Sequence, residues 1–174
     1  MVDPRARAAE VIEDLNLKLL PIPLEKIVKK YNATIIERTD FGDDLCGMII
    51  KQDGKFVIGV NKNHPATRQR FTIAHEIGHM LMHSEIIDKV HIDKTFNYSL
   101  KRDGRSKIGE DRMEIQANQF AAELLMPSKF LQKELESGYV DFENGFEAIA
   151  KKYGVSVQAM SIKMTEVFPA LDLV

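Results

Sequence analysis

Residues 64–82 are the segment that most restricts how this chain can fold. His64-Pro65 opens a helical pattern that runs to about residue 82, and proline is well placed in the first turn of a helix. Inside this stretch, the sequence His75-Glu76-Ile77-Gly78-His79 separates two histidines by four positions. On a helix these histidines lie one turn apart and are rotated by only about 40°, so both imidazoles project from the same face.

Two histidines on one helical face can bind the same metal ion. Glu76 lies about 100° round the helix from His75, so it completes the coordination poorly but can reach a water molecule bound to the metal. This is the geometry of a general base acting on metal-bound water, and His-Glu-x-x-His within a helix is typical of zinc enzymes. The single cysteine, Cys46, excludes a disulfide and a zinc site built on thiolates. The ligands must therefore be mainly nitrogen and oxygen atoms.

The third ligand has to come from another part of the chain. His83 lies two turns from His75, about 12 Å along the axis, and three residues spread that far on one straight helix cannot bind one ion. We therefore interpret His83 as a helix-end histidine, where a positive charge suits the helix dipole. Glu114, in a helix predicted at 110–126, is the best candidate. The alternative for Glu114 is a solvated carboxylate near the start of its helix.

The predicted helix 110–126 has a face that suits close contact with the histidine helix. The residues that share this face are Glu114, Ala117, Asn118, Ala121 and Leu125. Gly78 and the alanines would let the two helices approach closely, with Glu114 on the ion. We expect Asn118 to accept a hydrogen bond from a ligand histidine, which would fix the orientation of that ring.

The other patterns predict an α+β fold, mostly helical, with a small three-stranded antiparallel sheet beside the histidine helix. Strand-like runs cover 33–37, 45–51 and 55–60, and Asp53-Gly54 between the last two is a strong hairpin signal. Residues 84–109 show no clear periodicity. Besides 64–82 and 110–126, helices are predicted at 4–17, 24–31, 128–136, 142–153 and 156–168.

We expect one domain over residues 1–174. Its parts are a helical N-terminus (1–32), the sheet (33–61), the two site helices (64–127) and C-terminal helices (128–174).

The chain has 24 Lys+Arg and 26 Asp+Glu, a net charge of −2, which argues against a main role in neutralising nucleic-acid phosphates. Neither a long apolar span nor a secretory signal is found in the sequence, so we expect a cytoplasmic protein that does not contact membranes.

The chain resembles the ImmA/IrrE family of metallopeptidases in two long motifs. These are Phe71-Thr72-Ile73-Ala74-His75-Glu76-Ile77-Gly78-His79 and Glu114-x-x-Ala117-Asn118-x-Phe120-Ala121-Ala122-x-Leu124-Leu125-Met126-Pro127. The resemblance implies a zincin-like fold of the gluzincin kind and a zinc-dependent endopeptidase, with Mn²⁺ as an alternative metal. It implies a protein substrate, often a phage-type or mobile-element repressor. It also matches His75, His79 and Glu114 to the metal ligands, Glu76 to the catalytic base and Asn118 to the residue that supports a ligand.

The expected mechanism is attack of metal-bound water on a peptide bond. Glu76 would take the water proton and pass it to the leaving amine. His91 and Tyr98, in the segment between the two site helices, are candidates for stabilising the oxyanion, or else are ordinary loop residues. An extended peptide could add to an edge of the sheet near Gly47-Met48-Ile49.

Two other functions are compatible with parts of the sequence. Residues 147–162 have the helix, glycine turn, helix pattern of a DNA-binding helix-turn-helix. However, the second helix, 157–167, carries only Lys163 as a cation, so we favour a helical pair that packs against the core. The other alternative is a regulatory module that binds metal without turnover.

Overall fold

The computed structural model describes residues 3–85, 90–94, 106–136 and 146–169, and these form seven helices and four strands. The helices are α1 (Pro4–Asp14), α2 (Leu24–Lys30), α3 (Ala66–Met82), α4 (Ser106–Leu125), α5 (Ser128–Glu136), α6 (Glu147–Tyr153) and α7 (Val157–Val167). The strands are β1 (Ala33–Arg38), β2 (Leu45–Gln52), β3 (Lys55–Asn61) and β4 (Val90–Lys94). The predicted α+β class with a majority of helix is confirmed.

The sheet is mixed and has four strands in the order β1-β3-β2-β4. Strand β2 pairs antiparallel with both β3 and β4, whereas β1 runs parallel to β3. The prediction of three antiparallel strands is therefore wrong in the number of strands and in the direction of β1. A hydrophobic pattern shows that a segment is a strand, but it carries no information about which neighbour the strand pairs with.

The turn between β2 and β3 forms at Asp53-Gly54, as predicted. Both residues have positive φ angles, 51° and 73°, which a tight hairpin turn requires and glycine adopts without a steric penalty. The resulting register places Ile49 opposite Ile58, and both side chains are completely buried. Because alternate residues share a face, Gly47 lies on the same face of β2 as Ile49.

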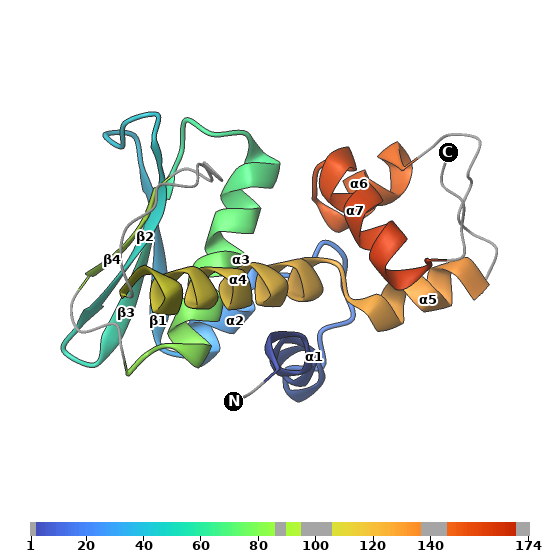
Figure 1. The fold of residues 1–174 in the computed structure, drawn as a ribbon, viewed down its shortest axis with the longest axis horizontal. Helices are drawn as coiled ribbons and strands as arrows, with labels where there is room; N and C mark the ends of the chain where they lie inside the picture. Colours follow the sequence, from blue (N-terminus) through green and yellow to red (C-terminus); the bar gives the residue numbers. More distant parts are fainter. Residues whose placement is uncertain (1–2, 86–89, 95–105, 137–145, 170–174) are drawn as a thin grey trace.

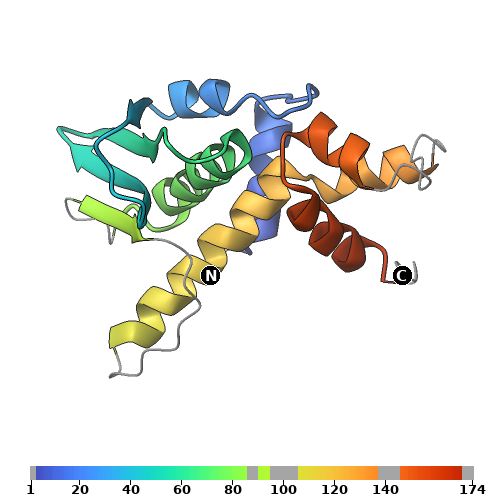
Figure 2. The ribbon, with the colours of Figure 1, turned by 90° about the horizontal axis from the view of Figure 1, so that it is seen from above.

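Helix α3 packs between the sheet and α4. It contacts β2 and β3 on one side and α4 on another, and α4 continues past α3 to pack on α1 before the chain turns into α5 (Figures 1 and 2). One apolar cluster contains buried side chains from helices α1 to α7 and from the sheet. The central helix of this arrangement is the one that carries the His-Glu-x-x-His sequence.

Some helix ends differ from the prediction. Helix α1 ends at Asp14 rather than residue 17, and Asn16 beyond it has a left-handed backbone with φ 46°. Helix α4 begins at Ser106, before the predicted residue 110. Residues 142–145 of the predicted helix 142–153 lie outside the described part. Within the described residues, no helix combines the length and apolar character needed to cross a membrane.

A buried ion pair connects the C-terminal helices to α4. Lys163 Nζ donates to Glu123 Oε2 at 2.7 Å, and the two side chains are only 2% and 9% exposed. Glu123 also accepts hydrogen bonds from the backbone N–H and the hydroxyl of Ser128, at 2.9 and 2.7 Å. One carboxylate therefore joins α4, α5 and α7.

We expect Lys163→Met to lower the free energy of unfolding by about 3–5 kcal/mol, because the Glu123 charge would stay buried without this counter-ion. Lys62→Met is the matched control. Lys62 pairs with Glu37 at the surface, where both side chains are more than half exposed, and such pairs contribute about 0–1 kcal/mol. Urea denaturation measures both effects. Equal losses in the two variants would contradict a structural role for the buried pair.

Candidate metal centre

Helix α3 buries the ionisable residues of its central turns. His75 and Glu76 are 0% exposed and His79 is 1% exposed. The helix follows Pro65, whose carbonyl accepts a hydrogen bond from the backbone N–H of Gln69 at 3.0 Å. Because the sheet covers one side of α3 and α4 another, these polar side chains lie in an environment from which most water is excluded.

The three predicted ligands meet where α4 packs on α3. The Nε2 atoms of His75 and His79 are 2.9 Å apart. The carboxylate oxygens of Glu114 lie 3.1 Å from His75 Nε2 and 3.2 Å from His79 Nε2. The Glu114 side chain is 35% exposed, so the group of three meets solvent on the Glu114 side.

The spacing of these atoms suits a zinc ion. Ligands that lie 2.0–2.1 Å from a tetrahedral zinc are about 3.3 Å from one another, and the three observed separations are only slightly shorter. Ligand atoms of all three residues lie within 4.8 Å of one another. Two imidazole nitrogens and a carboxylate that turn their lone pairs toward one point repel each other unless a cation lies between them. The residues therefore fit a divalent metal.

Asn118 holds the ring of His75. The Oδ1 atom of Asn118 accepts a hydrogen bond from His75 Nδ1 at 2.8 Å. Because a carboxamide oxygen can only accept, Nδ1 carries the ring proton, and Nε2 turns its lone pair toward His79 and Glu114. The hydrogen bond predicted for Asn118 is confirmed.

Gly78 allows α3 and α4 to approach closely. A Cβ atom at this position would lie 3.1 Å from Phe120 Cδ1, 3.2 Å from Ala117 Cα and 3.3 Å from the Ala117 carbonyl oxygen. Ala117 and Ala121 are completely buried. The predicted contact between small residues is confirmed, and it sets the separation at which Glu114 reaches the two histidines.

We expect Gly78→Ala to weaken zinc binding about tenfold or more, because the added methyl group pushes α4 and Glu114 away from the histidines. The free energy of unfolding should change less clearly, since overpacking costs about 1–3 kcal/mol while alanine favours the helix by about 1 kcal/mol. Gly42→Ala is the control, because a Cβ there would meet nothing within 4 Å. Titration with a zinc-chelating dye measures affinity. Unchanged affinity in Gly78→Ala would show that the helix separation does not depend on this glycine.

The Glu76 carboxylate lies beside strand β2. A Cβ atom at Gly47 would be 3.4 Å from Glu76 Oε1 and would collide with the Thr72 methyl group. Gly47 therefore lets β2 pass directly next to this carboxylate. The rotation of about 100° between consecutive helical residues explains why Glu76 faces the sheet while His75 faces α4.

His83 contacts the site, contrary to our interpretation of it as an ordinary helix-end histidine. It does follow the last residue of α3, but it is only 6% exposed. Its Nδ1 atom lies 3.2 Å from Nδ1 of His79, and its Nε2 atom lies 3.0 Å from Gln116 Oε1. The distance from His75 excludes His83 as a third ligand on a straight helix. However, its position four residues after His79 is itself the signal of contact between the two rings.

The remaining predictions concern Tyr98, His91 and the Gly47-Met48-Ile49 segment. Tyr98 lies outside the described residues, and His91 is described only through its backbone, which pairs with Ile49 in strand β4. The Gly47-Met48-Ile49 segment is not at an edge, because β2 lies between β3 and β4. In the described sheet, the edges are β1 and β4.

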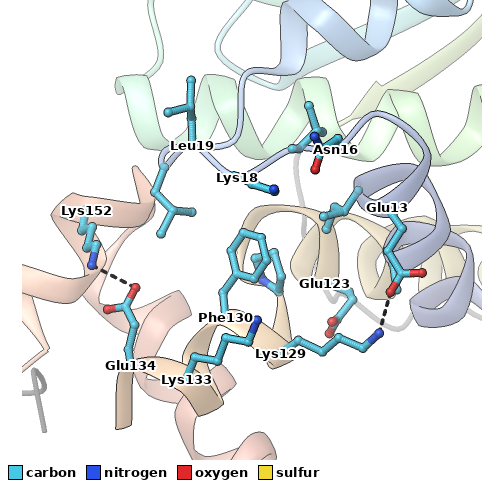
Figure 3. Close-up of a pocket in the computed structure, with 15 residues that line it drawn as sticks. Glu13, Asn16, Lys18, Leu19, Glu123, Lys129, Phe130, Lys133, Glu134 and Lys152 are labelled. Carbon is cyan, nitrogen blue, oxygen red and sulfur yellow. Dashed lines mark hydrogen bonds and ion pairs between the residues drawn. The ribbon is translucent and has the colours of Figure 1, made fainter. Parts of the chain in front are cut away.

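A hollow of about 740 Å³ lies between the end of α1, residues 16–20 and helix α5 (Figure 3). The ion pairs that border it are Glu13–Lys129 and Glu134–Lys152. The hydrogen bond and charge of Lys129 hold the pKa of the Glu13 carboxyl below its ordinary value. Glu123 in its lining lies nine residues after Glu114, about 14 Å along α4, so the hollow is separate from the three-residue group.

The chain is similar to known proteins in sequence and in fold. Residues 13–165 match the sequence profile of the peptidase M78 family, described as the IrrE N-terminal-like domain. Metallopeptidase ImmA of Bacillus subtilis (strain 168) is 30% identical over 119 residues, which cover 67% of this chain and 60% of that protein. A solved structure of a Mycobacterium tuberculosis transcriptional regulator has a similar fold, with a TM-score of 0.63 and 12% identity. That similarity covers 94% of this chain and 46% of the regulator.

Proposed function

The chain belongs to the IrrE N-terminal-like family of metallopeptidases, and from this membership we propose that it is a zinc-dependent endopeptidase acting on a protein substrate. The observation that carries the proposal is the group formed by His75, His79 and Glu114 where α4 packs on α3. In the proposal these three residues hold the metal, and Glu76 is the general base.

Zinc is the metal that this set of donors favours. Catalytic zinc sites use three nitrogen or oxygen ligands from the protein and keep one position for water or substrate. When bound, zinc lowers the pKa of water and polarises the scissile carbonyl. Mn²⁺ is compatible with the same ligands and is the alternative metal.

In this proposal Glu76 transfers the protons of the reaction, and Asn118 fixes the proton on His75. Glu76 accepts the proton of the attacking water and delivers it to the nitrogen of the leaving amine. Its carboxylate is completely buried, so bulk water does not compete for that proton. Asn118 keeps the Nδ1 proton on His75, which leaves Nε2 as the ligand atom.

We propose that an extended segment of the substrate pairs with strand β4. This strand forms an edge of the described sheet, and its Asp93 pairs with Gly47, the residue beside the Glu76 carboxylate. A peptide added to the outer side of β4 would lie about 4.8 Å farther out and would present its backbone in a regular register. An extended backbone is the form in which a peptidase can reach a scissile carbonyl.

A repressor of the phage or mobile-element type is the substrate that the family resemblance supports. We also propose that residues 1–174 act as one metallopeptidase domain in the cytoplasm. The support for a single domain is the apolar cluster, which contains side chains from α1 through α7.

The test is an incubation of the purified chain with a repressor encoded beside its gene, with zinc and with excess chelator. We expect two fragments whose masses add up to the intact repressor plus one water, formed only with zinc. The His75→Ala variant is the negative control. If the chain binds no zinc, the assigned metal centre is wrong. If it binds zinc but leaves the repressor intact, either this repressor is not the substrate or the chain binds metal without turnover.

The structure gives little support to the DNA-binding alternative. Helices α6 and α7 do flank Gly154, which has a left-handed backbone with φ 67°. However, Lys163 is the only Lys or Arg in α7, and it is buried in the ion pair with Glu123. Helix α7 therefore offers phosphates no cation of its own. The other alternative, a metal-binding module without turnover, predicts bound zinc and no fragments in the same incubation.

A further inference from the structure

His83 forms a chain of hydrogen bonds that runs from α4 to a proposed metal ligand. Gln116 Oε1 lies 3.0 Å from His83 Nε2, and His83 Nδ1 lies 3.2 Å from His79 Nδ1. The backbone N–H of His83 also donates to the carbonyl of His79 at 2.8 Å. At 6% exposure, His83 is one of the few buried polar residues of the described chain.

The direction of these hydrogen bonds follows from the chemistry of the partners. The Gln116 oxygen can only accept, so the proton of the neutral His83 ring is on Nε2. His83 Nδ1 is then an acceptor, and His79 Nδ1 must donate to it. The Nε2 atom of His79 is left without a proton, and it is the atom that lies 3.2 Å from Glu114 Oε1.

The opposite orientation of the Gln116 amide would prevent His79 from binding a metal through Nε2. A Gln116 N–H donating to His83 Nε2 would place the His83 proton on Nδ1, and His79 Nδ1 would then accept. The proton of His79 would move to Nε2 and block the atom that faces Glu114. Only the arrangement with the Gln116 oxygen toward His83 leaves both Nε2 atoms with lone pairs turned toward Glu114.

We propose that His83 and Gln116 are positioning residues that hold the His79 ring in the orientation and tautomer needed for metal binding. Asn118 does this for His75 by direct contact, whereas Gln116 does it for His79 through a second imidazole. Helix α4 therefore supplies a proposed ligand, Glu114, and the two amides that orient the other ligands. This inference rests on the proposed metal centre.

The zinc affinity of the folded chain tests whether His83 and Gln116 position the His79 ring. We expect His83→Leu to weaken zinc binding about 10- to 100-fold, the usual loss when the partner of a ligand histidine is removed. His83→Asn should recover most of the affinity, because its side-chain oxygen can accept from His79 Nδ1. Gln116→Leu should have a smaller effect than His83→Leu, because the His83 ring stays in place. The d–d absorption of the cobalt-substituted chain should change most in His83→Leu and less in Gln116→Leu and His83→Asn.

Controls separate this inference from the proposed function. His64→Leu removes a histidine outside the site and should bind zinc like the wild type, whereas His75→Ala should not bind it tightly. Circular dichroism of the metal-free chain shows which variants fold. If His83→Leu does not fold, the zinc affinity of Gln116→Leu takes its place. Weaker binding than in the wild type and in His83→Asn supports the inference, and unchanged binding contradicts it. If the wild type binds no zinc, both proposals are wrong. If only His75→Ala loses affinity while the His83 and Gln116 variants match the wild type, this inference alone is wrong.

Discussion

Glu76→Gln is expected to abolish cleavage of the substrate while leaving zinc bound. The carboxamide cannot accept the proton of the attacking water, and general acid–base catalysis by one side chain contributes about 10²- to 10⁴-fold. The zinc affinity should stay close to that of the wild type, because Glu76 faces β2 rather than α4 and is not one of the three grouped ligands. Fragment formation under single-turnover conditions and zinc titration on the same sample measure the two properties separately.

The control for this variant is Glu147→Gln, an exposed glutamate in the first turn of α6. It makes the same chemical change at an exposed position that is not part of the three-residue group, and it should cleave at the wild-type rate. Normal cleavage by Glu76→Gln would show that another group removes the proton. Loss of zinc together with cleavage would show that Glu76 supports the metal centre instead of acting as the base.

Much of the local structure was predictable because short-range patterns determine it. The three strands over 33–61 lie within one residue of the predicted bounds, since Asp53-Gly54 fixes the turn and apolar runs flank it. Strand β4 was missed, although Val90 and Ile92 alternate with polar residues in its sequence. Five residues are too few for such alternation to be distinguished from chance. The parallel pairing of β1 with β3 depends on contacts between distant segments, which no local pattern records.

The residues of the candidate site that follow helical spacing rules could be predicted from the sequence. The four-residue separation of His75 and His79 places both on one face of α3. The face of α4 that carries small residues indicated both Glu114 and Asn118. The distance between His75 and His83 along the helix excludes direct metal binding by His83, but it carries no information about the contact between His83 and His79. Gln116 gave no signal of its own, since it reaches His83 only through the packing of α4 on α3.

Glu114→Ala is expected to reduce zinc affinity by more than about a hundredfold and to abolish cleavage with it. Supporting residues of metal ligands already contribute about 10- to 100-fold, and Glu114 supplies the only carboxylate of the three grouped residues. The two histidines on α3 would remain, but two neutral ligands cannot replace the charge that a carboxylate contributes. Isothermal titration of the metal-free chain with zinc measures the loss.

Thermal or urea unfolding gives an independent measure of the same effect. At a zinc concentration a thousand times the wild-type Kd, bound zinc stabilises the wild type by about 4.1 kcal/mol, whereas a variant with hundredfold weaker binding gains about 1.4 kcal/mol. Ile115→Ala is the control, because Ile115 is the next residue on α4 and its side chain is 52% exposed. It should gain as much from zinc as the wild type does. Equal stabilisation of Glu114→Ala by zinc would mean that the carboxylate is not a ligand, and the third ligand would then have to be sought elsewhere in the chain.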